Sequence, residues 1–438
     1  MTEDEAYRTS TQYRLWSFTP EALASLRSTT NALAADRVRI AIKRTREAKA
    51  LSTDTGSGST SETETAATAA AKQQNGRGES NGTATPSFNK EADQEIECLT
   101  VEEEQKLIGF YCVRAMELSD FCNFPTNVKA TAVQFLKRFY LSNSPMTYHP
   151  KSIMPSAVFL ATKTENHYTS LRSFSSKLGS KVTPDDVIAP EYLVTQGLRF
   201  TFDVRHPLRG LEGGFMELLA LAEGKGVPLA GRGERRSPQE LQAEMQRQVG
   251  AENAAGLTVR IRTAHGKAKE ILKTAAVLTD AYFLYTPSQI WLATLLRVDE
   301  PLAMYYIDTK FPLAITASSG SGVQGGGGGD DGTSMTMNAV VAELKAKLVT
   351  TLRACATLLA STTATVSPSK EEFAELKRID KKLYACRNPE KIDIAGLSRG
   401  PKREGASSEE EQAAKKRKFE REKADQEAAD VFGPELKK

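Results

Sequence analysis

The sequence predicts an all-α protein built from two tandem five-helix bundles with further helices at both ends. Apolar residues recur at three- and four-residue intervals through most of the chain. Helix-start signals, in which a capping residue precedes proline or stands three residues before glutamate, punctuate those segments. No convincing run of alternating apolar and polar residues, as a strand would need, interrupts them. The two groups of helices are similar in size, which indicates a diverged internal repeat.

The composition narrows the function classes before any motif is considered. The 438 residues suffice for two or three domains, and the net charge of +3 is too small for nucleic acid or an anionic membrane to be the main partner. The polar N-terminus and the absence of an 18-residue apolar run predict a soluble intracellular protein. No C-x-x-C pair occurs, so we expect free, mostly buried thiols of a reducing compartment at all five cysteines: Cys98, Cys112, Cys122, Cys355 and Cys386.

Residues 1–50 are predicted to form an N-terminal helical arm. Thr19 is a capping residue followed by proline, and leucines then recur at helical spacing. Trp16 and Phe18 precede this cap and are expected to dock on another part of the protein, although a solvated helix without a partner is the alternative. Residues 51–95 hold almost no large apolar side chain, so they are predicted to be a disordered low-complexity insert.

Residues 96–204 are predicted to form the first bundle. A capping box at Thr100 and Glu103 starts its first helix. Four more helices should start near Thr126, at His149-Pro150, at Leu171 and at Thr183, the last of them running through Leu193 to Phe200. The third helix is apolar nearly all round and should lie at the centre. Two prolines stand inside predicted helices, where proline removes a backbone hydrogen bond: Pro155, tolerable if that helix effectively starts near Ser152, and Pro190.

Residues 205–360 are predicted to form the second bundle. It should begin at His206-Pro207, carry a long amphipathic helix over residues 259–285, and restart at Thr286-Pro287 and again at Pro301. A partly helical loop insertion is expected near 223–256, and a second insertion at the Gly/Ser-rich stretch 317–334, before a final helix over 340–359. Residues 361–390 should add a C-terminal helix over 373–384, and residues 391–438 a disordered charged tail.

Residues that could carry catalysis are missing from the pattern. There is no H-E-x-x-H, G-x-S-x-G or P-loop motif, and the four histidines are scattered. We therefore expect no catalytic residues, no cofactor and no metal site. One basic cluster in the tail is either a nuclear import signal or a solvated charge run, and the sequence favours neither: Lys415, Lys416, Arg417 and Lys418.

Several stretches of the chain resemble the cyclin family. Residues 135–141 (FLKRFYL), 146–151 (MTYHPK) and 159–165 (FLATKTE) are similar to the second and third helices of a cyclin box. Residues 278–290 (LTDAYFLYTPSQI) and 10–18 (STQYRLWSF) are similar to transcriptional cyclins of the H type. The resemblance covers roughly residues 10–40, 96–310 and 338–387, and it implies a first, kinase-binding cyclin box at 96–204 and a second at 205–360.

This resemblance implies a nuclear, non-enzymatic subunit that activates a cyclin-dependent kinase. Its partners would be the catalytic subunit of the CDK-activating kinase, a RING-containing assembly factor and the core of general transcription factor IIH. The substrates of that complex are kinase activation loops and the RNA polymerase II C-terminal repeats. In the family, one lysine and one glutamate hydrogen-bond the kinase, and Lys163 and Glu191 match them. The residues alone favour an internal ion pair that only fixes the two helices, and the two roles can coexist.

Three other interpretations stay open at this point. The chain could be a transcriptional cyclin of the C, K or T type, although the sequence segment at residues 285–288 (YTPS) argues against this. A DNA-bound factor resembling the IIB core would need a zinc ribbon and a strongly basic face. An enzyme would need a catalytic set. Residues 101–123 contain no match to the M-R-A-I-L motif of mitotic cyclins, which argues against substrate recruitment by that patch.

Overall fold

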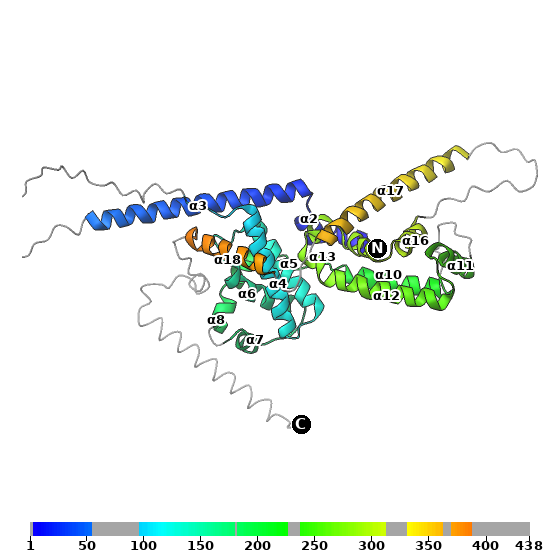
Figure 1. Cartoon of the computed structure of the whole chain (residues 1–438), viewed down its shortest axis with the longest axis horizontal. Helices are drawn as coiled ribbons and strands as arrows, with labels where there is room; N and C mark the ends of the chain where they lie inside the picture. Colours follow the sequence, from blue (N-terminus) through cyan, green and yellow to red (C-terminus); the bar gives the residue numbers. More distant parts are fainter. Residues whose placement is uncertain are drawn as a thin grey trace, which may run out of the picture. The chain divides into compact units, whose positions relative to one another are not determined.

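The computed structural model describes residues 3–54, 96–179, 182–226, 237–311, 331–361 and 369–387, all within one compact unit, Met1–Lys391. Every regular element in these ranges is an α-helix (Figure 1), so the predicted all-α class is confirmed. Residues 55–95, most of the Gly/Ser stretch and the basic cluster Lys415–Lys418 lie outside the described residues. No described helix is long and apolar enough to cross a membrane.

The N-terminal arm contains α1 (Glu3–Arg8), α2 (Thr11–Trp16) and α3 (Pro20–Asp54). The last of these begins at the predicted proline and extends four residues past the predicted end of the arm. Its small buried side chains Ala34, Ala35 and Val38 pack in one cluster with Leu107 of the first bundle and Ile379 near the C-terminal end. The arm is therefore packed against the body of the protein over this part of its length.

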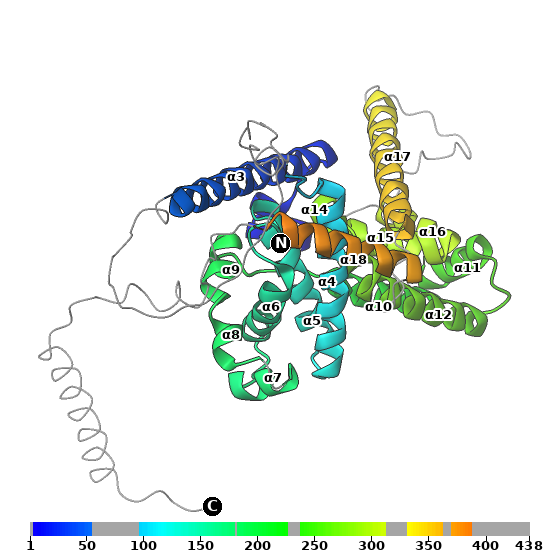
Figure 2. The same ribbon diagram turned by 60° about the vertical axis from the view of Figure 1, so that its left-hand side comes forward.

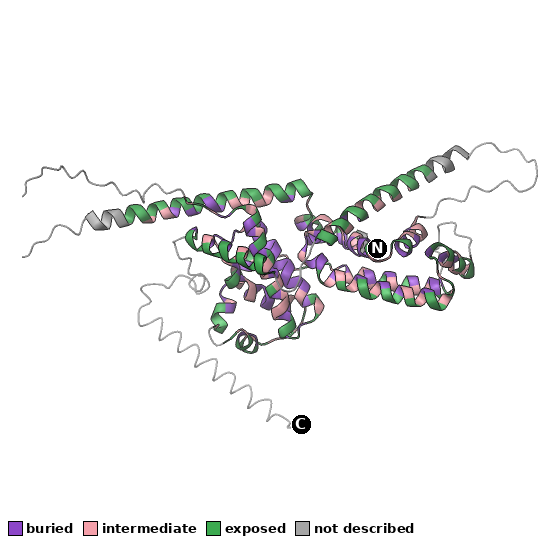
Figure 3. Cartoon of the chain, viewed as in Figure 1, coloured by how far each residue is buried: buried purple, intermediate pink, exposed green. Residues whose placement is uncertain are grey.

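The first bundle is built around two buried helices. It contains α4 (Val101–Phe121), α5 (Thr126–Ser142), α6 (Pro150–Thr164), α7 (Leu171–Lys177), α8 (Pro184–Ile188) and α9 (Glu191–Gly197). The predicted capping box at Thr100 and Glu103 is present. Most side chains of α5 and α6 are buried (Figure 3), and α4, α8 and α9 pack around these two helices. The nearly all-apolar helix therefore lies in the core, as expected.

The two prolines of this bundle have different effects. The single fifth helix predicted from Thr183 to Phe200 is wrong, because the chain forms α8 and α9 with a break at Ala189–Pro190. Proline cannot donate a backbone hydrogen bond, and its ring clashes with the preceding turn. By contrast, α6 is continuous through Pro155 and begins at Pro150 rather than near Ser152. Pro155 leaves the Lys151 carbonyl in the first turn without its usual backbone donor, and the helix continues past it.

The second bundle is built around α15. It contains α10 (Leu208–Ala222), α11 (Pro238–Val249), α12 (Ala254–Lys273), α13 (Ala275–Leu278), α14 (Ala281–Leu284), α15 (Pro287–Val298), α16 (Glu300–Lys310) and α17 (Asp331–Ser361). Trp291 of α15 lies against the backbone of α10, where a Cβ at Gly210 or Gly214 would come within 2.6 or 2.4 Å of its ring. These glycines allow the two helices to approach closely. The predicted insertion at 223–256 includes α11, which starts with a capping box at Ser237 and Glu240.

The long helix predicted over residues 259–285 is also wrong. The chain leaves helical geometry at Thr274 and again after Leu278, giving α12, α13 and α14. Side chains of α5 donate hydrogen bonds to backbone carbonyls that would accept from backbone N–H groups in a continuous helix. Gln134 donates to the Val277 carbonyl at 3.1 Å, and Lys137 donates to the carbonyls of Leu278 and Thr279. The break is thus decided by contact with the first bundle.

One further helix, α18 (Lys370–Ala385), packs across α4 (Figure 2). It closes the cluster that holds the arm, since Ile379 and Leu383 are buried there. All five cysteines are free thiols, four buried and Cys98 partly so, as expected for their pairing and burial.

Candidate functional site

Lys163 and Glu191, the two residues singled out in the sequence, form an ion pair. The Lys163 Nζ lies 2.7 Å from each carboxylate oxygen of Glu191. Both side chains reach solvent, with exposures of 43% for Lys163 and 21% for Glu191. The ammonium also lies 4.7 Å from the centroid of the Phe159 ring. The internal ion pair that the residues allowed is therefore present, and it lies at the surface.

Local sequence explains why these two side chains meet. Lys163 stands in the last turn of α6 and Glu191 at the first position of α9. A cation at a helix C-terminus and an anion at a helix N-terminus are each stabilised by the helix dipole. Pro190 ends the preceding turn and places Glu191 at the start of a separate helix. Pro190, which the sequence placed inside a single helix, therefore sets the position of Glu191.

Exposed aromatic side chains stand close to this ion pair in the chain. Tyr192 follows Glu191 and is 61% exposed, Phe200 follows the end of α9 and is 61% exposed, and Tyr168 in the loop after α6 is 91% exposed. Aromatic residues are enriched in protein interfaces relative to the rest of the surface. These three residues could not be singled out from the sequence, because an aromatic residue near a helix end looks the same there whether it is buried or exposed.

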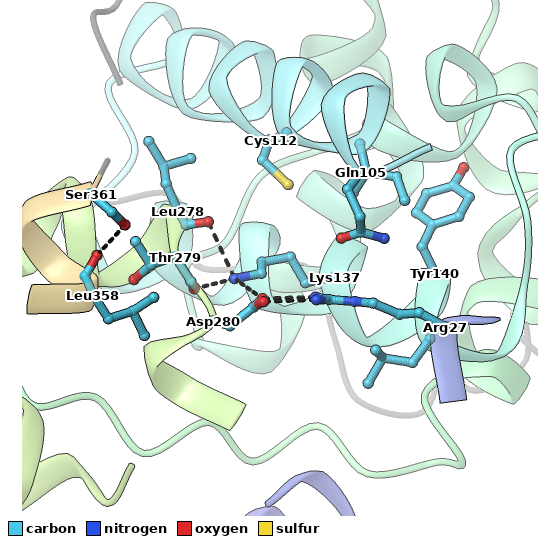
Figure 4. A pocket seen from close by; sticks show the side chains of 13 residues that line it. Arg27, Gln105, Cys112, Lys137, Tyr140, Leu278, Thr279, Asp280, Leu358 and Ser361 are labelled. Carbon is cyan, nitrogen blue, oxygen red and sulfur yellow. Dashed lines mark hydrogen bonds and ion pairs between the residues drawn. The ribbon is translucent and has the colours of Figure 1, made fainter. Parts of the chain in front are cut away.

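A second charged cluster joins the arm and both bundles (Figure 4). The Arg27 guanidinium binds Asp280 through two hydrogen bonds of 2.7 Å, and the Lys137 Nζ lies 3.5 Å from the same carboxylate. Lys137 is only 8% exposed. Burial lowers the pKa of Lys137, while for Asp280 the two cations outweigh burial and hold the pKa at about 2. We call these three residues the junction cluster.

The junction cluster borders a cavity of about 280 Å³ between α4, α5 and the end of α17. Gln105 and Cys112 of α4 and Tyr140 of α5 line it, with Ser361 on the opposite side (Figure 4). The cluster was not found from the sequence. The sequence feature that could have revealed it is the pair Lys137-Arg138 in the middle of an apolar helix, because two adjacent cations in a buried helix need partners.

A partly buried histidine forms a second polar bridge across the bundles. His206 lies 2.8 Å from the Thr131 hydroxyl of α5 and 3.0 Å from the Tyr282 hydroxyl of α14. Burial, with a smaller contribution from Arg138, lowers the pKa of His206 to about 4. Within the described ranges, no three His, Cys, Asp or Glu side chains gather as a metal site requires. The arrangement is suited to holding helices together.

Comparison with known proteins gives a consistent result. The family described as the cyclin C-terminal domain matches residues 206–360. Cyclin CCL1 of Saccharomyces cerevisiae is 31% identical over 312 residues, which cover 71% of this chain and 63% of that protein. Cyclin-H of Xenopus laevis is 36% identical over 129 residues, covering 27% of this chain and 39% of that protein.

A solved structure extends the likeness to most of the described fold. A chain in the CAK complex from Chaetomium thermophilum, bound to ATP-gamma-S, superposes with a TM-score of 0.60 and 28% identity, covering 91% of this chain and 94% of that one. The present chain spans less than two thirds of the length of the curated relatives named above. Residues 206–360 therefore form a cyclin C-terminal domain, and the chain with its two helical bundles is similar to relatives of cyclin H.

Proposed function

We propose that this protein is a regulatory subunit that binds and activates a cyclin-dependent kinase, and that it has no catalytic residues of its own. The observation that carries the proposal is the exposed ion pair of Lys163 and Glu191 at the α6–α9 corner of the first bundle. By the resemblance to cyclins, Lys163 and Glu191 match the lysine and the glutamate that contact the kinase in that family. The exposed Tyr192 and Phe200 at the two ends of α9 would extend the same docking face.

The paired side chains keep hydrogen-bonding capacity for a partner. The lysine ammonium has three protons and the glutamate carboxylate about four acceptor positions, so their mutual contact leaves donors and acceptors unused. The ion pair also limits the motion of each side chain before the partner arrives, which reduces the entropy lost on binding. Lys163 and Glu191 would therefore offer a prearranged donor and acceptor to the kinase.

Activation would follow from selective binding to one kinase state. A kinase whose regulatory helix is swung out holds its catalytic lysine and glutamate apart. A rigid docking face that fits only the swung-in helix shifts the population toward the active state. Moving the kinase from 1% to 99% active requires about 5.5 kcal/mol of preference. The buried α5–α6 core beneath the ion pair gives this face the rigidity that selective binding needs.

The finer assignment is to the CDK-activating kinase within general transcription factor IIH. It is supported by the relatives cyclin CCL1 and cyclin-H and by the likeness to a chain of a CAK complex. In this assignment the other partner is a RING-containing assembly factor, and the substrates are kinase activation loops and RNA polymerase II C-terminal repeats. The protein would work in the nucleus, with Lys415–Lys418 as the import signal.

The test is capture of a kinase by the full-length chain from nuclear extract, with identification of the bound kinase by mass spectrometry. We expect a cyclin-dependent kinase, and about tenfold weaker binding to it for Lys163→Met and for Glu191→Gln. Lys273→Met is the matched control, because Lys273 also pairs with a glutamate, Glu270 at 3.0 Å, but on α12. Failure to capture any kinase, or equal loss with the control, would contradict the proposal.

A further inference from the structure

The turn that follows α9 has an unfavourable backbone. Arg199 and Phe200 have φ angles of 53° and 56°, so two consecutive non-glycine residues are left-handed. This conformation is disfavoured for residues with a Cβ, and above all for bulky ones. Such residues persist where surrounding contacts determine their conformation, and they cluster at functional positions. Here the result is a phenylalanine that is 61% exposed at the end of the proposed docking helix.

The turn closes α9 with two backbone hydrogen bonds, from the Arg199 N–H to the Gln196 carbonyl at 2.8 Å and from the Phe200 N–H to the Thr195 carbonyl at 3.0 Å. The side-chain contacts that add to these bonds come from the N-terminal arm. Trp16 is 2% exposed, and its Nε1 donates a hydrogen bond of 2.9 Å to the Thr201 hydroxyl. The Arg199 guanidinium lies 5.3 Å from the centroid of the same ring system, within the range of a cation–π contact. Trp16 therefore contacts the residues on both sides of Phe200.

Two further contacts fix the chain just beyond the turn. The buried side chain of Gln12 accepts a 2.6 Å hydrogen bond from the Arg205 backbone N–H. Arg138 of α5, whose guanidinium lies 5.2 Å from the Trp16 ring, donates to the Asp203 carbonyl at 3.2 Å. Residues 199–205 are thus held between the arm and the core of the first bundle.

We propose that Trp16 is a positioning residue, which holds the strained Arg199–Phe200 turn so that Phe200 is presented to the kinase. The inference rests on the proposed function and adds a role for the arm in it. Trp16 is buried and does not reach the partner, so its effect passes through the turn. Strain relief should then stabilise the protein while weakening the complex, a combination that an ordinary helix end would not produce.

The first experiment relieves the strain with glycine, which adopts positive φ without penalty. We expect Phe200→Gly to raise Tm and to weaken binding of the kinase identified in the capture experiment by about tenfold. Arg199→Gly should raise Tm and weaken binding less, because Phe200 remains. Asn123→Gly is the control, since Asn123 has a φ of 58° after α4 and should leave binding unchanged. A Tm rise with unchanged affinity for Phe200→Gly would overturn the proposal.

The second experiment is a double-mutant cycle on the full-length chain. Trp16→Phe keeps an aromatic ring but removes the N–H that binds Thr201. We expect about fivefold weaker kinase binding in the Phe200 background and no more than about twofold in the Phe200→Ala background, because coupled residues are not additive. Equal losses in both backgrounds would show that Trp16 acts only on general stability.

Two controls separate the possible failures. If Trp16→Phe does not fold, Arg199→Met takes its place in the cycle, because it removes the cation–π contact with the Trp16 ring. A loss of binding that depends on Phe200 would again support the proposal, and equal losses in both backgrounds would again contradict it. The wild-type chain is measured first against the kinase subunit from the same genome that is most similar to that of the CAK complex. No wild-type binding contradicts the proposed function itself, whereas wild-type binding without coupling contradicts only the role of Trp16.

Discussion

Two lysine–carboxylate pairs of this protein have opposite surroundings. Lys163 and Glu191 face solvent at the corner of one bundle, whereas Lys137 and Asp280 lie between two bundles and share Arg27 of the arm. An exposed ion pair contributes little to stability because water and salt compete for both charges. A buried charge that loses its partner is strongly destabilising. Burial therefore separates a pair that can serve a partner from one that holds the fold.

The junction cluster also has a topological role that the exposed pair lacks. Arg27 and Asp280 are 253 residues apart in the chain, and Lys137 lies 143 residues before Asp280. A single carboxylate thus connects the arm, the first bundle and the second bundle. Lys163 and Glu191 connect only two helices of the first bundle. The comparison predicts that substitutions at the junction act on folding and those at the exposed pair act on binding.

The largest effect is expected for Asp280→Asn. The change leaves Lys137 and Arg27 without their common counter-charge, and losing one partner of a buried pair costs about 3–5 kcal/mol. Unfolding in urea, followed by circular dichroism, measures the loss. Asp36→Asn is the control, because the exposed pair of Asp36 and Arg39 should contribute less than about 1 kcal/mol. Similar losses for both variants would contradict the distinction between the two clusters.

Acid should also weaken the contact between the bundles that His206 makes with Thr131 and Tyr282. Burial lowers its pKa to about 4 in the folded protein, so below the ordinary value of 6.5 the unfolded chain binds more protons. Stability should therefore fall as the pH decreases from 6.5 to 4, by about 3 kcal/mol from this residue. The measurement is the free energy of unfolding at several pH values in this range. In His206→Asn, the free energy of unfolding should fall less over the same pH range. If the variant and the wild type show the same pH dependence, His206 is not the group responsible.

A smaller effect is expected for Arg27→Lys, which keeps the charge at the junction. Lysine cannot reproduce the two parallel hydrogen bonds to Asp280, so about 1.5 kcal/mol of stability should be lost. Arg39→Lys provides the comparison at an exposed site, where little change is expected. Should Arg27→Lys match the wild-type Tm, charge alone and not geometry would explain the junction cluster.

The smallest effect on stability is expected for Lys163→Met. The side chain is 43% exposed, and its ion pair should contribute less than about 1 kcal/mol to folding. Chemical denaturation of the free chain measures this loss of stability. A separate measurement of kinase affinity should show about a tenfold loss. A stability loss comparable to that of Asp280→Asn would remove the contrast on which the two roles depend.

Local signals in the sequence determined where most helices start. Thr100 with Glu103, and Thr286 before Pro287, mark helix starts that the structure contains. These signals succeed because a cap depends on residues only three positions apart. The family resemblance also identified Lys163 and Glu191, and the structure shows them hydrogen-bonded to each other. Helical periodicity was sufficient for the fold class, since the pattern is repeated over most of the chain.

Only the tertiary structure decided where helices break and which charges are buried. The break after Leu278 depends on Lys137, which takes carbonyls about 140 residues further along the chain. The strained turn at Phe200 likewise depends on Trp16, 185 residues before the Thr201 hydroxyl that it binds. No local pattern encodes such contacts, because they form only when packing brings distant segments together. Helix starts were therefore readable from neighbours in the sequence, whereas helix breaks and buried partners required neighbours in space.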